Sequence, residues 1–237
     1  MVIEPFIFNW KGKSENSKKI FFQLNSIFDK VKVINSDDHY CPENWINIGD
    51  EFYFCGQFNT ALKNFSGDIL FHIQGDVSYD RWEELVSDAI YYFKHYDCGI
   101  YSPNIDYTWY TTERFRIEDK RNLLRHQNLD IIGCTDETVW FIHKDIINQF
   151  KDYNINLRNE DYGWGIDLVL ASISFLNKKL VLRDKNHKII HPRGTNYDQE
   201  KAEIQFKNLR KQLPKKVDKC ISLIKREKQS KLYKYLS

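Results

Sequence analysis

The first half of the chain alternates between short apolar runs with strand character and longer segments whose apolar residues recur at helical spacing. Residues 5–10, 31–34 and 68–73 are the strand-like runs, and residues 14–29 and 54–65 carry the helical spacing between them. Such alternation favours parallel strands, because each intervening helix returns the chain to the same edge of the sheet. The sequence therefore predicts a three-layer α/β/α sandwich with a mainly parallel mixed sheet of the Rossmann-like type.

The second half of the chain carries further strand and helix patterns. Asp80, followed three residues later by Glu83, predicts a capping box at the start of a helix. Residues 165–176 are apolar nearly all round, which is typical of a buried helix. The other expected elements are strands at 45–48, 98–101, 180–183 and 188–191, two strands within 131–143, loop and edge structure over 102–128, and terminal helices at 198–213 and 217–236.

The length and the charge distribution suggest a body with an appendage. The 237 residues fit one α/β domain, and no Pro/Gly/Ser-rich linker divides it, so we expect a domain over 1–198 and a helical extension over 199–237. The extension has 12 Lys and Arg against four Asp and Glu, although the whole chain is only +2. Such a basic segment can contact an anionic membrane or nucleic acid, and it can equally be a solvated helix that ends the fold.

Composition and missing motifs exclude several classes of protein. The sequence has no run of about 18 apolar residues, so we expect no membrane span. It has no secretory signal pattern, and its five cysteines form no C-x-x-C pair, which predicts a cytoplasmic protein, peripheral to the inner membrane face if the basic extension binds lipid. The absence of G-x-x-x-x-G-K-[ST], G-x-G-x-x-G, G-x-S-x-G and H-E-x-x-H argues against the enzyme classes that depend on them.

Two polar residues at predicted strand ends are candidate metal ligands. Asp76 follows the strand over residues 68–73, at the edge where open α/β sheets bind ligands, and Gly75 permits close approach of a substrate. A carboxylate there can hold Mn²⁺ or Mg²⁺, which bridge phosphate oxygens. His191 ends a later strand, and a neutral imidazole is a suitable second ligand for Mn²⁺. The alternatives are a loop carboxylate and a structural histidine.

Asp37 and Asp38 follow the second predicted strand. A carboxylate at this position can accept hydrogen bonds from a ribose hydroxyl or a base N–H. The alternative is an Asx-turn, because Asn-Ser-Asp-Asp is also ordinary turn chemistry.

The segment "NEDYGWGID", residues 159–167, combines acids with two glycines that flank Trp164. Asp167 falls in the first turn of the buried helix, whose N-terminus favours the ionised carboxylate that a general base requires. Trp164 offers a flat apolar face that suits a sugar ring. The alternative is that Asp167 complements the helix dipole and Trp164 packs in the core. Glu160 and Asp161 are further candidate bases in the same segment.

The segment "GQFNTALKNFSGDILFHIQGDVSYD" resembles the central block of nucleotide-sugar glycosyltransferases with the GT-A fold, of the inverting, family-2-like kind. In the D-x-D-type motif of that block, Gln74 replaces the first acid and Asp76 keeps the last, which is the usual metal ligand. The segments "PFIFNW", "VINSDD", "NEDYGWGID" and "HPRGTNY" resemble other parts of the same fold in the expected order, so that the resemblance covers residues 5–198.

The resemblance implies transfer of a sugar from a nucleoside-diphosphate sugar to a hydroxyl of a glycan, a lipid-linked glycan or another acceptor, as in polysaccharide biosynthesis. It implies Mn²⁺ or Mg²⁺ at Asp76 and His191, and a base at Asp167, Glu160 or Asp161. The nucleotide-sugar-binding residues that it implies are Phe8, Asn9, Trp10, Asp37, Asp38, Gln74, Gly75 and Trp164.

Two other functions compete with this reading. A nucleotidyltransferase that makes nucleotide sugars needs a Gly-rich basic loop after the first strand, and "NWKGKSENSK" has a single glycine there. A non-catalytic carbohydrate- or nucleic-acid-binding relative would explain why Gln74 stands where an acid is expected.

Overall fold

A computed structural model of the chain describes residues 1–50, 52–106, 116–118, 123–124, 128–157, 161–192, 198–225, 232 and 235. Its strands are β1 (Ile3–Trp10), β2 (Lys32–Ser36), β3 (Ile46–Asn47), β4 (Ile69–Gln74), β5 (Cys98–Ile105), β6 (Arg116–Ile117), β7 (Leu129–Ile132), β8 (Val139–His143) and β9 (Leu180–Ile189). Its helices are α1 (Ser14–Asn25), α2 (Phe54–Asn64), α3 (Trp82–His95), α4 (Lys144–Asp152), α5 (Ile166–Leu176), α6 (Gln199–Gln212) and α7 (Lys215–Lys225).

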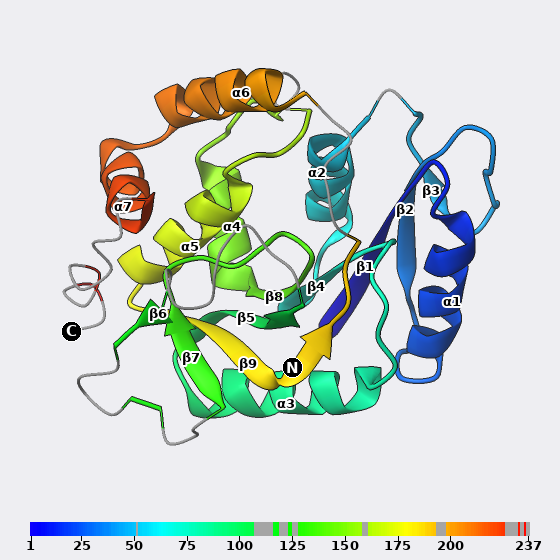
Figure 1. Cartoon of the computed structure of the whole chain (residues 1–237), viewed down its shortest axis with the longest axis horizontal. Helices are drawn as coiled ribbons and strands as arrows, with labels where there is room; N and C mark the ends of the chain where they lie inside the picture. Colours follow the sequence, from blue (N-terminus) through cyan, green and yellow to red (C-terminus); the bar gives the residue numbers. More distant parts are fainter. Residues whose placement is uncertain are drawn as a thin grey trace.

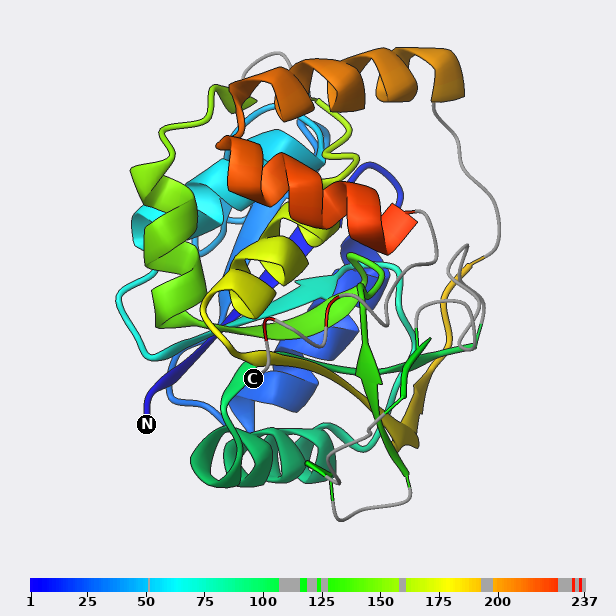
Figure 2. The ribbon, with the colours of Figure 1, turned by 90° about the vertical axis from the view of Figure 1, so that its left-hand side faces the viewer.

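The strands form one mixed sheet in the order β3-β2-β1-β4-β8-β5-β9-β7-β6. The first four strands of this order are parallel, β8 runs antiparallel to both of its neighbours, and β5 and β9 are parallel again. Helices α1 and α3 cover one face of the sheet, and α2, α4 and α5 cover the other (Figure 1, Figure 2). The predicted three-layer α/β/α sandwich with a mixed sheet is therefore confirmed.

The structure corrects three details of the sequence reading. Helix α3 begins after Arg81, and no described side chain caps its N-terminus, so the capping role predicted for Asp80 is wrong. Residues 180–183 and 188–191 were expected to be separate strands, but β9 is continuous and absorbs the interruption in a register shift against β5. Helix α4, which buries Ile146, Ile147 and Phe150, was not predicted.

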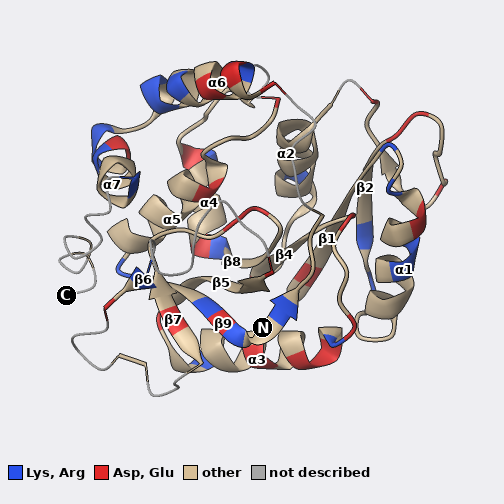
Figure 3. Cartoon of the chain, viewed as in Figure 1, with Lys and Arg blue, Asp and Glu red and all other residues tan. Residues whose placement is uncertain are grey.

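The two terminal helices pack outside the layer formed by α2, α4 and α5 (Figure 2). Helix α7 lies against α5 and buries Val217, Cys220, Ile221 and Ile224 in the main core. Lys and Arg residues lie along both helices (Figure 3). No helix within the described residues is long and apolar enough to cross a membrane. The division between a body and an extension at residue 198 stays a prediction.

His72 lies in the centre of β4, as a core residue. It is fully buried between the rings of Phe8, Phe54 and Trp140, and neither ring nitrogen has a hydrogen-bond partner among the described residues. Burial lowers the pKa of His72 from 6.5 to about 3. The folded protein therefore holds this imidazole neutral at pH values where the unfolded chain protonates it.

This burial predicts a loss of stability in acid. Because the pKa of His72 is lower in the folded protein than in the unfolded chain, its contribution to the free energy of unfolding is fully present above pH 6.5. This contribution disappears as the pH falls toward 3, since the unfolded chain then gains a proton that the folded protein does not. At about 1.4 kcal/mol per pH unit, the His72 term should cost about 2 kcal/mol of unfolding free energy between pH 6.5 and pH 5. Urea unfolding of wild type and His72→Phe at pH 7 and pH 5 measures it. The two proteins should differ in pH dependence by that amount, and identical pH dependence would contradict a neutral buried His72.

Candidate active site

The candidate site lies at the carboxyl edge of the parallel strands. Strand β1 pairs with β2 on one side and β4 on the other, and in these ladders Trp10 is opposite Ser36 and Phe8 is opposite Gln74. The chain runs from β1 to β2 on one side and only later returns to β4 on the other. This edge is thus the topological switch point at which open α/β sheets bind ligands.

A buried polar network occupies the ends of β1 and β2. The Asn9 amide donates to Asn35 Oδ1 at 2.6 Å, and the Ser17 hydroxyl donates to Asn9 Oδ1 at 2.7 Å. The Ser14 hydroxyl donates to Asp37 Oδ2 at 3.2 Å, and the backbone N–H of His39 donates to Asp37 Oδ1 at 3.0 Å. The network fixes Asp37, which is 5% exposed, beside the N-terminus of α1.

Gly75 makes the tight exit from β4. Its backbone N–H donates to the Phe8 carbonyl at 2.8 Å, and a Cβ at this position would lie 2.3 Å from Ser17 Oγ and 2.7 Å from the Phe8 carbonyl oxygen. The Asn16 amide donates to the carbonyls of both Gly75 and Val77 at 2.8 Å. Helix α1 thus holds the turn that carries Asp76.

The turn after β4 and the end of β9 come together, although they are more than 100 residues apart. Ser78 and Ile190 exchange backbone hydrogen bonds of 2.8 and 3.1 Å, and the N–H of His191 donates to Asp106 Oδ1 at 2.9 Å. These contacts place His191 Nε2 3.6 Å from Asp76 Oδ1. The two predicted metal ligands therefore converge.

The Asp76 carboxylate lacks a complete set of partners. Its side chain is 10% exposed, and Oδ1 has no hydrogen-bond partner among the described residues. Burial raises the pKa of Asp76, while the charges of His191 and Lys13 oppose this rise. An unsatisfied buried carboxylate oxygen beside an imidazole is a donor set that fits a Mn²⁺-type cation.

The Gly-Trp-Gly loop is packed tightly between two helices. Gly163 and Gly165 have φ values of +78° and +95°, which favour glycine, and Cβ atoms there would lie 2.3 Å from the Phe54 ring and 2.2 Å from the Phe206 ring. Trp164 between them is partly buried and packs against the core.

The two candidate bases that the structure describes, Asp161 and Asp167, differ in exposure. Asp161 is partly exposed, and its Oδ2 accepts from Lys201 Nζ at 3.0 Å and from the Gln205 amide at 3.2 Å. Asp167 is 3% exposed, and its Oδ2 accepts from the Cys134 thiol at 2.9 Å. Glu160 lies outside the described residues.

Glu137 is a functional candidate that the sequence reading missed. Its Oε1 accepts the backbone N–H of Asp167 at 3.0 Å and so caps helix α5. Burial, and then the charge of Asp167, raise the pKa of Glu137 well above its usual range. The sequence does carry a signal for it, since the acids Asp136 and Glu137 stand one residue before the apolar run of β8.

The remaining predicted nucleotide-sugar-binding residues lie in different surroundings. The Phe8 ring is fully buried and packs on His72, so only its backbone reaches the site edge. Trp10 is partly exposed, and Asp38 is exposed and accepts the N–H of Asp50. The Gln74 amide donates to the Glu137 carbonyl at 2.9 Å.

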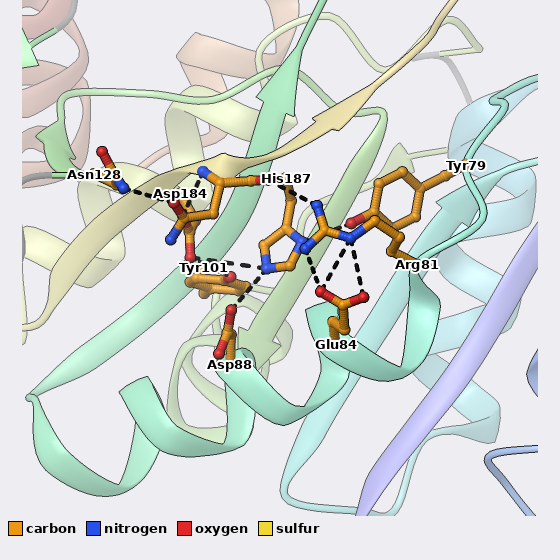
Figure 4. A network of polar contacts seen from close by, with 9 residues as sticks. Tyr79, Arg81, Glu84, Asp88, Tyr101, Asn128, Asp184 and His187 are labelled. Carbon is orange, nitrogen blue, oxygen red and sulfur yellow. Dashed lines mark hydrogen bonds and ion pairs between the residues drawn. The ribbon is translucent and has the colours of Figure 1, made fainter.

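A second cluster of ligand-type side chains lies between α3 and β9 (Figure 4). Asp88, Asp184 and His187 have ligand atoms that all lie within 4.8 Å of one another. His187 is already engaged at both ring nitrogens, with Tyr79 OH at 2.6 Å from Nδ1 and Asp88 Oδ2 at 2.8 Å from Nε2, and Asp184 accepts from the Tyr101 hydroxyl at 3.0 Å. Because these atoms satisfy one another, the cluster needs no cation to be stable.

Comparisons with known proteins identify the fold. The sequence matches no protein-family model and no curated protein. The structure is similar to that of S. aureus TarS, residues 1–349, in complex with UDP-GlcNAc, with a TM-score of 0.59 and 14% identity over 97% of this chain and 73% of that chain. It is also similar to GalNAc-T7 with UDP, GalNAc and Mn²⁺, with a TM-score of 0.53 and 11% identity, and there it spans 81% of its own length and 44% of that chain. The chain therefore has the GT-A fold of glycosyltransferases.

Proposed function

We propose that this chain is a glycosyltransferase that moves a hexose-type sugar from a nucleoside-diphosphate sugar to an acceptor hydroxyl, with a divalent cation at Asp76 and His191. The observation that carries the proposal is the 3.6 Å approach of His191 Nε2 to Asp76 Oδ1, which joins segments remote in sequence at the switch point of a GT-A fold. The UDP-GlcNAc and the UDP with Mn²⁺ in the two similar structures support the same class of donor.

The cation site would serve the leaving group. Asp76 and His191 would hold Mn²⁺ or Mg²⁺, and the bound ion would supply Lewis-acid stabilisation of the negative charge on the departing diphosphate. Lys13 lies close enough for its charge to lower the pKa of Asp76, and it precedes helix α1, whose N-terminus favours anions. Together these groups make one end of the site attractive to a diphosphate.

The ends of β1 and β2 would bind the nucleoside. Asp37 already accepts two hydrogen bonds that fix its orientation, and carboxylate oxygens have further lone pairs for a ribose hydroxyl or a base N–H. Asp38 and Trp10 are the more exposed neighbours at this edge. Asn9 and Asn35 would act indirectly, because they hold Asp37 and do not face solvent.

We propose Asp161 as the base, because it is the more exposed of the two described candidates. A base must come within hydrogen-bond distance of the acceptor hydroxyl, and the Asp161 side chain is 32% exposed whereas Asp167 is 3% exposed. Asp161 would take the proton as the acceptor oxygen bonds to the anomeric carbon and the bond from that carbon to the diphosphate breaks. A single displacement of this kind inverts the anomeric configuration. The Asp167 carboxylate would instead have a structural role as the acceptor of the Cys134 thiol, at the start of α5.

This assignment predicts a difference between two isosteric variants. Asp161→Asn should retain donor binding and lose transfer by roughly 10²–10⁴-fold, the usual contribution of a general base. Asp167→Asn should retain more transfer but lower the thermal stability, because Asp167 accepts from a buried thiol. Donor binding by calorimetry, initial transfer rates and thermal melts measure these quantities. If Asp167→Asn abolished transfer and Asp161→Asn did not, the two roles would be reversed.

The function itself is tested with a panel of UDP- and GDP-sugars and Mn²⁺. Glycosyltransferases of this proposed kind should hydrolyse the correct donor slowly without an acceptor, and EDTA should stop the reaction. If the protein instead formed nucleotide sugars and pyrophosphate from a sugar 1-phosphate and a nucleoside triphosphate, the nucleotidyltransferase alternative would replace the proposal. Binding of nucleotide sugars without any turnover would favour the non-catalytic relative.

The donor, the base and the acceptor class stay predictions, as do the role in polysaccharide biosynthesis, the cytoplasmic location and the peripheral membrane contact. Exposed lysines of α6 and α7, including Lys207, Lys211 and Lys216, support the last of these. Sedimentation of the full chain with anionic and with neutral vesicles would measure it.

A further inference from the structure

Gln74 joins a second acidic segment to the end of β4. Its backbone N–H donates to the Thr138 carbonyl at 2.9 Å, and its side-chain amide donates to the Glu137 carbonyl at 2.9 Å. Both bonds join the end of β4 to the turn that precedes β8. The residue that stands in place of an acid therefore holds the turn containing Asp136 against the strand that leads to Asp76.

The strand register indicates which residues then face each other. Strands β4 and β8 are antiparallel, with Ile69 opposite His143 and Ile73 opposite Val139. The Gln74–Thr138 bond continues this register beyond the ladder. Both chains turn beyond this point, and the bond brings the turn before β8, which includes Asp136, next to the turn after β4, which includes Asp76.

Neighbouring carboxylates repel each other, and a cation bound near both would relieve this repulsion. The charge of Asp136 is one of the causes that raise the pKa of Asp76, after the larger effect of burial. The Asp76 side chain is only 10% exposed, and its Oδ1 atom has no hydrogen-bond partner among the described residues. The arrangement resembles one side of a cation site more closely than a self-contained polar cluster.

We infer that Asp136 is the second carboxylate of the cation site and replaces, from the turn before β8, the acid that Gln74 does not provide. This inference rests on the proposed function, because it assumes a cation at Asp76 and His191. Asp136 would act through a cation-bound water, since Asp76, Asp136 and His191 do not form a group of described side chains whose ligand atoms all lie within 4.8 Å of one another. Mn²⁺ and Mg²⁺ sites commonly retain such waters.

The test measures Mn²⁺ affinity directly, from the free Mn²⁺ signal in electron paramagnetic resonance, with the full chain and without any sugar donor. Loss of a residue that orients a ligand or water of a metal site typically weakens metal affinity about 10–100-fold. We expect a loss of this size for Asp136→Asn, a smaller one for Asp136→Glu, and a larger one for Asp76→Asn. Asp80→Asn is the matched control, because Asp80 is exposed and four residues from Asp76.

The outcomes separate this inference from the proposed function. Wild-type affinity in Asp136→Asn, together with loss of binding in Asp76→Asn, would overturn the role of Asp136 and leave the cation site in place. Unchanged affinity in both variants, or no Mn²⁺ binding by wild type, would overturn both. Thermal melts confirm that each variant is folded. Gln74→Ala provides a second test, because it keeps both carboxylates and removes the side-chain amide that bonds to the Glu137 carbonyl. This variant should also weaken Mn²⁺ binding.

Discussion

Replacement of Asp76 by asparagine is expected to lower Mn²⁺-dependent hydrolysis of the donor sugar by roughly 10³-fold, the upper end of what one preorganised electrostatic group contributes. Asparagine keeps the size of the side chain and removes the charge that would bind the cation. The Oδ1 atom of this carboxylate is buried and accepts no hydrogen bond from the described residues. Release of the nucleoside diphosphate over time, at saturating Mn²⁺, measures the effect.

Asp80→Asn is again the control, since it changes an exposed carboxylate close in sequence and should hydrolyse the donor as wild type does. Asp76→Asn should fold as well as wild type. Burial of a carboxylate with a raised pKa destabilises the folded state, and the substitution removes that charge. Equal hydrolysis rates in wild type and Asp76→Asn would show that the diphosphate is not activated at this position.

Gly165→Ala is expected to destabilise the protein by about 3 kcal/mol, through backbone strain and overpacking together. The residue has a φ of +95°, and its new Cβ would lie 2.2 Å from two atoms of the Phe206 ring. Helix α6 would have to move away from the loop that carries Asp161. Urea unfolding measures the loss of stability.

Gly12→Ala isolates the backbone part of this effect. Gly12 has a similar φ of +81°, but a Cβ there meets nothing within 4 Å. It should therefore lose only about 1–2 kcal/mol, the cost of a left-handed conformation for a residue with a side chain. Equal losses in the two variants would contradict the tight contact between the Gly-Trp-Gly loop and α6.

The convergence of the two proposed cation ligands, Asp76 and His191, was predictable because both residues follow strands. Asp76 and His191 each follow an apolar run, and open α/β sheets bring strand ends to one edge. The alternation of strands and helices similarly predicted the layers of the sandwich. Local periodicity and end signals were sufficient for these features.

Features that depend on packing between remote segments were not predictable. Whether Asp167 or Asp161 is accessible depends on Cys134 and on helix α6, and neither is near in sequence. The role of Gln74 depends on the register between β4 and β8, which a single strand does not encode. Asp80 satisfied a local capping pattern, but α3 begins one residue later than that pattern requires and Arg81 pairs with Glu84 instead.

The central claim is that Asp76 and His191 together hold a cation. Its most direct test is pulsed electron paramagnetic resonance of Mn²⁺ bound to the full chain with UDP or GDP, which detects coupling to a histidine nitrogen. We predict a nitrogen coupling in wild type that disappears in His191→Gln and persists in His187→Gln, which alters the second cluster. A coupling that persists in His191→Gln and disappears in His187→Gln would contradict the account and place the cation between Asp88 and Asp184.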